Sequence, residues 1–118
     1  MIIDSHEHIF SDAKKQIELI DKAGVDKTIL FSTTFHPENC SNASEIENES
    51  QIYLDLSAVF STFQIKAAVW QLPEKCLFSS DAPMGDPLIY RFMLEKTISD
   101  KSVLKQVLGE NIECILNI

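Results

Sequence analysis

Residues 1–8 read Met1-Ile2-Ile3-Asp4-Ser5-His6-Glu7-His8, and this stretch decides how the fold is predicted. Two isoleucines followed by alternating side chains are typical of a short strand. Residues two apart on a strand face the same way, so His6 and His8 can present their imidazoles to one point. Such a pair suits zinc, manganese or iron, and the end of an amino-terminal strand is where α/β proteins place their sites. A chance pair of exposed histidines is the alternative.

The residues that follow predict a βαβ unit. A helix begins near Ser11 or Asp12 as its cap, and Gly24 ends it. One face of this helix is apolar and consists of Ala13, Ile17, Ile20 and Ala23. Residues 27–32 are largely apolar, as in strands of a parallel sheet that are buried on both faces.

A second pair of strands is predicted beyond a polar stretch. Residues 35–50 are polar and indicate a long loop, or a loop with a short helix. Residues 52–57 then have strand character, and a helix with apolar positions between Ile65 and Leu72 ends at Pro73. Residues 76–80 form a fourth strand candidate, which leads into Asp81.

Helices fill the remainder of the chain. One is marked by Leu88 and Phe92, a second is closed by Gly109, and residues 111–116 make a last turn or two. The whole pattern amounts to about four βα units, half of a closed (β/α)8 barrel of roughly 250 residues.

Asp81 is the second candidate site residue. It follows an apolar strand, where a carboxylate can bind a metal or take a proton from bound water; a helix-capping or turn aspartate is the alternative. Two histidines and one carboxylate are a sufficient protein ligand set for a catalytic metal with an open water position.

Other polar and aromatic residues are given lesser roles. His36 is foremost a loop residue, and Glu7 points away from the face shared by His6 and His8, so a supporting role is expected for it. Asp55 lies inside a strand and would need a partner if buried, which suggests a role in a polar network. The aromatic residues expected in the core around a helix are Phe60, Phe63 and Trp70.

Composition argues against several kinds of partner. The 118 residues are 45% hydrophobic, enough for one soluble domain over 1–118, and the net charge of -8 opposes binding to nucleic acid or anionic membranes. No stretch approaches the roughly 20 apolar residues of a membrane span, and an acid at position 4 precedes any signal-like core, so a cytoplasmic protein is expected. Three widely spaced cysteines predict neither a disulfide framework nor a CxxC metal pair.

These segments resemble a known family. The stretch 2–8 resembles the first-strand motif of amidohydrolase-related proteins, a branch of the amidohydrolase superfamily with a TIM-barrel fold. Residues 53–57 are similar to the seventh strand of that family, and 77–83 to the eighth, where a "GSD-P" pattern carries a metal-site aspartate. Residues 108–111 are similar to the "G-x-N" opening of the terminal helix. Two motifs in the right order with a matching tail are more specific than either alone.

The resemblance implies a metal-dependent hydrolase that has lost strands 3–6 of its barrel. A divalent ion, zinc first and manganese or iron as alternatives, would activate water for attack on a small-molecule substrate. His6 and His8 would be metal ligands, and Asp81 a ligand or the acid/base. Two departures stand against this: nothing here supplies the further histidines that follow strands 5 and 6, and Ser79 replaces the usual glycine. A non-catalytic remnant, or an oligomer-forming scaffold with an incomplete metal site, is the competing interpretation.

Two strand orders are open for the partial barrel. Right-handed crossovers throughout give the order 1, 2, 7, 8 in family labels, which puts His6 and His8 on one edge and Asp81 on the other. A homodimer joined edge to edge would then complete the barrel and rebuild two composite sites. The alternative order, 7, 8, 1, 2, keeps the three residues together in one chain and requires the 35–52 linker to cross back over the sheet.

Overall fold

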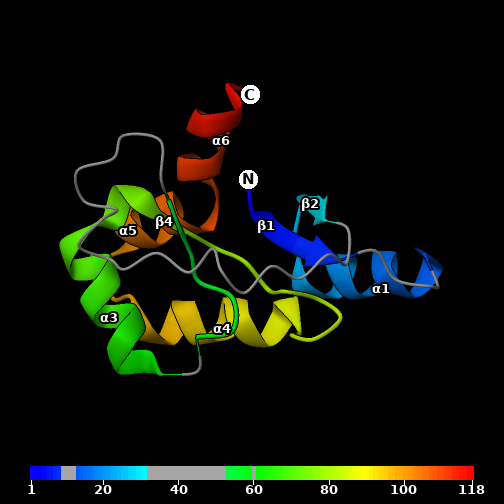
Figure 1. Cartoon of the computed structure of the whole chain (residues 1–118), viewed down its shortest axis with the longest axis horizontal. Coiled ribbons are helices and arrows are strands. Elements are labelled where there is room, and N and C mark those ends of the chain that lie inside the picture. Colours follow the sequence, from blue (N-terminus) through cyan, green and yellow to red (C-terminus); the bar gives the residue numbers. More distant parts are fainter. Residues whose placement is uncertain (9–12, 32–52, 60) are drawn as a thin grey trace, which may run out of the picture.

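The computed structural model describes residues 1–8, 13–31, 53–59 and 61–118, and the statements below refer to these residues. Short strands occupy the middle of the molecule and helices surround them (Figure 1). Helix α1 lies towards one end, α3 and α5 lie towards the other, and α4 runs beneath the strands in this view (Figure 1).

The amino-terminal segment forms the predicted βαβ unit. Strand β1 (Ile3–His8) pairs in parallel with β2 (Lys27–Phe31), and α1 (Ala13–Ala23) connects them. Gly24 ends α1 with a φ of 65°, a left-handed conformation that glycine adopts without steric cost. Arg91 reinforces this turn from α4, since its guanidinium donates to the carbonyl of Ala23 at 2.7 Å.

The second pair of strands is shorter than predicted. Strand β3 (Leu54–Asp55) pairs in parallel with β4 (Cys76–Leu77), and α3 (Thr62–Gln71) and the 3-10 turn η2 (Pro73–Lys75) lie between them. Ser61 begins α3 as its cap, because its hydroxyl accepts the amide hydrogen of Gln64.

Backbone hydrogen bonds join the two strand pairs side by side. Beyond β4 the chain continues along β1, where Ser5 N donates to Phe78 O at 3.0 Å and Asp81 N donates to His6 O at 2.8 Å. Glu7 and Ala82 form a parallel bridge. The spatial order is therefore β3, β4, β1, β2, which is the 7, 8, 1, 2 alternative. The order 1, 2, 7, 8 is wrong, because β1 lies between β2 and the 78–82 segment.

The carboxyl-terminal helices differ from the prediction at Gly109. Helix α4 (Pro87–Thr97) is followed by α5 (Lys101–Lys105), the π-helical turn η3 (Gln106–Glu110) and α6 (Asn111–Leu116), and these last three are continuous. Gly109 does not close a helix but lies inside this run. Gly109 allows the backbone of Met1 to approach closely, since a Cβ atom at this position would lie 2.0 Å from the carbonyl oxygen of Met1.

The main core lies between α3, β4, α4 and the α5–η3 run. Its largest buried members include Ile65, Phe78, Leu94 and Val107. The prediction that Phe63 and Trp70 are core aromatics is wrong, because they are 78% and 88% exposed. The buried face of α3 is formed by Ile65 and Val69 instead, so the two aromatic rings lie on its outer side.

The described residues thus form a mixed α/β fold with two short parallel sheets. Predictions that fall on residues 35–50, including the loop and His36, and the one for Phe60, lie outside the described residues. Among the residues described, no helix is long and apolar enough to cross a membrane.

Candidate metal centre

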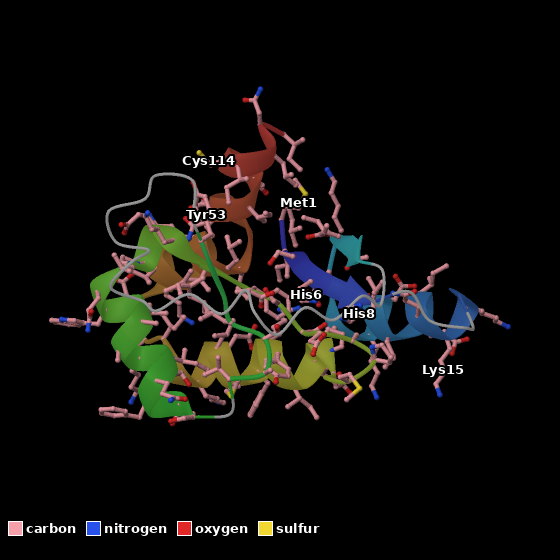
Figure 2. All side chains as sticks on the ribbon, in the orientation of Figure 1. Met1, His6, His8, Lys15, Tyr53 and Cys114 are labelled. Atoms are coloured by element: carbon pink, nitrogen blue, oxygen red, sulfur yellow. The ribbon has the colours of Figure 1, made fainter. Side chains whose placement is uncertain are left out.

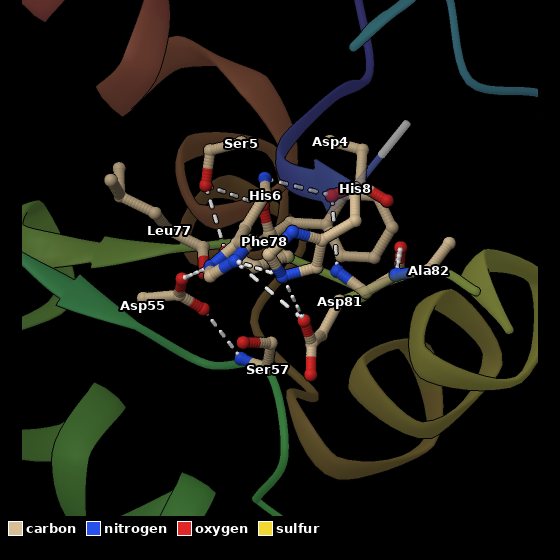
Figure 3. A network of polar contacts seen from close by, with 12 residues as sticks. Asp4, Ser5, His6, His8, Asp55, Ser57, Leu77, Phe78, Asp81 and Ala82 are labelled. Carbon is tan, nitrogen blue, oxygen red and sulfur yellow. Dashed lines mark hydrogen bonds and ion pairs between the residues drawn. The ribbon is translucent and has the colours of Figure 1, made fainter. Parts of the chain in front are cut away.

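His6, His8 and Asp81 come together in one chain (Figure 3). The two Nε2 atoms of the histidines lie 3.3 Å apart. Asp81 Oδ1 lies 3.0 Å from His8 Nε2 and 3.6 Å from His6 Nε2. These three atoms form a nearly equilateral triangle, and they belong to the three residues that the sequence predicts as metal ligands.

The triangle has the size that a small tetrahedral ion requires. Zinc lies about 2.0–2.2 Å from histidine nitrogen and carboxylate oxygen, so two such ligands at the tetrahedral angle are about 3.3 Å apart. The three measured separations bracket this value. The side chains of His6, His8 and Asp81 are 27%, 22% and 25% exposed, so the three residues are only partly buried.

Strand geometry brings the two histidines to one side. His6 and His8 alternate with the buried side chain of Glu7, and their rings meet edge to face with centroids 5.1 Å apart. They lie side by side near the centre of the molecule (Figure 2). The backbone of the same residues also holds the segment that carries Asp81, because His8 N donates to Ala82 O at 2.6 Å and Asp81 N donates to His6 O.

A tight loop sets the position of Asp81. Its φ is 57°, a left-handed conformation that aspartate tolerates better than most residues. Its carbonyl accepts the amide hydrogens of Met84 and Gly85, at 2.9 and 3.1 Å. Gly85 allows this closure, since a Cβ atom there would lie only 2.0 Å from Ser80 O.

Asp4 supports the centre from the buried side. It is completely buried, and its Oδ1 accepts hydrogen bonds from His6 N at 3.1 Å and Ser80 N at 3.0 Å. Burial raises the pKa of Asp4 to about 7, against hydrogen bonds that favour the ionised form. Asp4 therefore ties the histidine strand to the segment that carries Asp81.

Glu7 points away from the face shared by His6 and His8, as the alternation along β1 predicts. Its side chain is completely buried on the opposite side of β1, and Gln16 on α1 donates to its Oε2 at 2.9 Å. The same Gln16 amide also donates to His8 O. Glu7 therefore fixes α1 against the strand and does not take part in the triangle.

Asp55 is the residue whose role the sequence suggests least clearly. It is partly exposed, yet its Oδ2 lies 2.5 Å from His6 Nδ1 and its Oδ1 accepts Ser57 N at 2.7 Å (Figure 3). Burial alone would raise the pKa of Asp55, but hydrogen bonds from Ser57, His6 and Ser79 outweigh it and hold the pKa below its usual value. A carboxylate followed two residues later by serine, within a strand next to the Asp81 strand, is the pattern that could have indicated it.

Ser79 stands where the related pattern has glycine, and the structure accommodates it. Its side chain is buried and its hydroxyl lies 2.8 Å from that of Ser5. Ser5 also donates to Phe78 O at 2.9 Å. The serine therefore adds a hydroxyl pair between β1 and the β4 segment.

No protein-family model matches the chain, and a search of curated proteins found no match. The assignment of a function therefore rests on the residues and their geometry.

Proposed function

We propose that this protein binds one divalent metal ion, most simply zinc, through His6, His8 and Asp81, and uses it to hydrolyse a small molecule. The observation that carries the proposal is the triangle of Nε2, Nε2 and Oδ1 atoms with separations of 3.3, 3.0 and 3.6 Å. Manganese and iron accept the same donors and are the alternative ions.

The donor set fits a catalytic ion better than a purely structural one. Structural zinc sites are usually closed by four protein ligands, whereas catalytic sites have three protein ligands and one open position. When bound, a divalent ion would supply Lewis-acid chemistry, which polarises a carbonyl or ionises water at near-neutral pH. The protein's own contribution is to present the two imidazole Nε2 atoms to one point and to place beside them a carboxylate that can take the proton.

Asp81 is suited to both roles. Its Oδ1 makes both contacts to the histidines, which leaves Oδ2 as the oxygen that can accept a proton. The left-handed turn at Asp81 and the bond from its amide to His6 O fix the carboxylate beside the imidazoles. Asp81 is thus the residue we assign as ligand and acid/base.

The strand order supports descent from an amidohydrolase-related barrel. In a closed eight-stranded barrel the last strand neighbours the first, so strands 7, 8, 1 and 2 are consecutive. The order β3, β4, β1, β2 is the same sequence of neighbours, with the histidine pair on β1 and the aspartate beyond β4. We infer a partial TIM barrel of this family from that agreement and from the motifs around residues 2–8 and 77–83.

Metal binding is tested first. The purified chain, stripped with a chelator, is titrated with zinc by calorimetry, and we expect one ion per chain. Thermal unfolding should shift upward, by a stabilisation of about 2.7 kcal/mol at a free zinc concentration 100 times the Kd. His6→Ala, His8→Ala and Asp81→Ala should abolish binding, whereas Asp21→Ala on exposed α1 is the control and should not. Absence of binding to zinc, manganese and iron would refute the proposal.

Hydrolysis is tested separately with ester, amide and phosphoester probes. We expect turnover that depends on added metal and is lost in Asp81→Asn. Metal binding without turnover of any probe would instead support the non-catalytic alternative.

Two features favour that second candidate, an oligomer-forming scaffold. Among the described residues β2 pairs only with β1, and β3 only with β4, so no described strand pairs with their outer edges. Phe63 and Trp70 add exposed aromatic surface on α3. A homodimer is no longer needed to bring Asp81 to the histidines, but it would cover such surfaces. A monomeric mass in solution well above micromolar concentration would remove this candidate.

A further inference from the structure

We infer that Asp55 is a positioning residue of the metal centre: it fixes the tautomer and orientation of His6 so that Nε2 presents its lone pair to the ion. The inference deepens the proposed function and rests on it.

The side chains of Asp55 and His6 are in direct contact. Asp55 Oδ2 lies 2.5 Å from His6 Nδ1, and an ionised carboxylate has no hydrogen to donate and can only accept. The hydrogen of a neutral His6 ring therefore lies on Nδ1, and Nε2 carries the free lone pair. The edge that Nε2 presents is the one that faces His8 and Asp81.

Asp55 is itself held in place by its neighbours. Its Oδ1 accepts the amide hydrogen of Ser57 at 2.7 Å, which leaves Oδ2 to His6. Pairing of Asp55 with Leu77 fixes the register of β3 against β4, and Leu56 N donates to Leu77 O at 3.2 Å. The strand that carries the Asp55 carboxylate is therefore paired with the strand that leads to Asp81.

The two histidines differ in the hydrogen bonding of Nδ1. His8 Nδ1 is buried and has no hydrogen-bond partner among the described residues, whereas His6 Nδ1 has Asp55. Metal-binding histidines usually donate their second ring nitrogen to a carboxylate or carbonyl, and such partners affect metal affinity by 10- to 100-fold. Among the described residues only His6 has such a partner, so Asp55 should act on one proposed ligand and not on both.

The first measurement needs no metal. Nitrogen-15 spectra of the metal-free chain report the tautomer of each histidine, and we expect His6 to carry its hydrogen on Nδ1. In Asp55→Ala the His6 signals should shift towards the Nε2–H tautomer, while those of His8 should not change. A wild-type His6 with its hydrogen on Nε2 would overturn the inference, whether or not the chain binds metal.

The second measurement uses cobalt(II) and zinc as probes. Asp55→Ala should weaken zinc binding by about 10- to 100-fold and alter the visible absorption of the cobalt form. Asp55→Asn retains an acceptor oxygen and should recover part of the affinity. Asp21→Asn, with the same change of charge on exposed α1, is the control and should match wild type. Wild-type affinity and spectrum in Asp55→Ala would refute the role of Asp55 while leaving the metal site intact; absence of binding in wild type would refute the site itself.

Discussion

Asp4 Oδ1 accepts the backbone amide hydrogen of Ser80 at 3.0 Å, although the two residues are 76 positions apart in the chain. The same oxygen also accepts from His6 N. One buried carboxylate therefore bonds to the strand with the histidines and to the segment with the aspartate. Asp4 therefore links the two segments that carry His6, His8 and Asp81.

Two replacements of Asp4 should separate the contribution of its acceptor oxygen to the free energy of unfolding from the contribution of its charge. Asp4→Ala leaves the amides of His6 and Ser80 without their acceptor, which should cost about 1–3 kcal/mol of unfolding free energy. Asp4→Asn keeps an acceptor oxygen and should cost less. Denaturant unfolding of both variants measures the difference. Equal stability of Asp4→Ala and wild type would show that this link is unimportant.

Gly85→Ala should disturb the Asp81 loop. The new Cβ atom would lie 2.0 Å from Ser80 O and 2.8 Å from the Tyr90 ring, so the backbone has to move. We expect lower stability and a weaker metal affinity, measured by thermal unfolding and zinc titration. Met84→Ala is the matched control in the same loop, since Met84 is exposed and its side chain should be dispensable. A Gly85→Ala variant that binds zinc as wild type does would contradict this account of the loop.

The two described cysteines should differ in reactivity. Burial raises the pKa of the Cys76 thiol from 9.0 to about 12, while Cys114 is exposed. In a Cys40→Ser background, alkylation of the native chain near pH 8 should modify Cys114 and spare Cys76 until the chain unfolds. Mass spectrometry of digested samples measures this. Rapid modification of Cys76 in the folded chain would show that its surroundings are more open than the structure indicates.

The same thiol gives stability a pH dependence with a definite sign. The folded state keeps the Cys76 proton up to about pH 12, whereas the unfolded state loses it near pH 9. The unfolded chain therefore binds fewer protons between these values, and Cys76 should lower the stability as pH rises through that window. Cys76→Ser has no such titration and should flatten the decline.

Trp70 should fluoresce as a solvated indole. It is the single tryptophan and is 88% exposed, so acrylamide should quench it almost as strongly in the folded as in the unfolded chain. If chains associate through this part of α3, quenching should weaken as protein concentration increases. Strong protection at every concentration would mean that the outer side of α3 is covered within one chain.

Local patterns predicted much of this molecule. The apolar periodicity of 13–23, the glycine at its end and the strand before it gave the βαβ unit, because each depends only on neighbouring residues. The histidine pair on alternate positions of β1 and the aspartate beyond the β4 segment also followed from spacing and position, and the structure brings these three together.

Longer-range relationships could not be predicted in the same way. The two strand orders require the same strands and helices, and only the contacts between β1 and the 78–82 segment distinguish them. Glycine is typical of a helix end, but the small size of Gly109 allows close contact with the backbone of Met1, a residue at the far end of the chain. Helix α3 carries apolar residues on more than one side, so its periodicity did not show that Trp70 faces outward. Asp55 acquires its partner only when β3 lies beside β4.

The central place of β1 also bears on how the chain folds while it is being translated. Its first neighbour, β2, leaves the ribosome soon after it, but residues 78–82 follow only when β3 and α3 have been made. In that interval one edge of β1 has no partner, and an unpaired strand edge is a place where nascent chains associate wrongly. The two imidazoles are thus synthesised well before the Asp81 carboxylate, and the proposed metal site can form only after that late segment arrives.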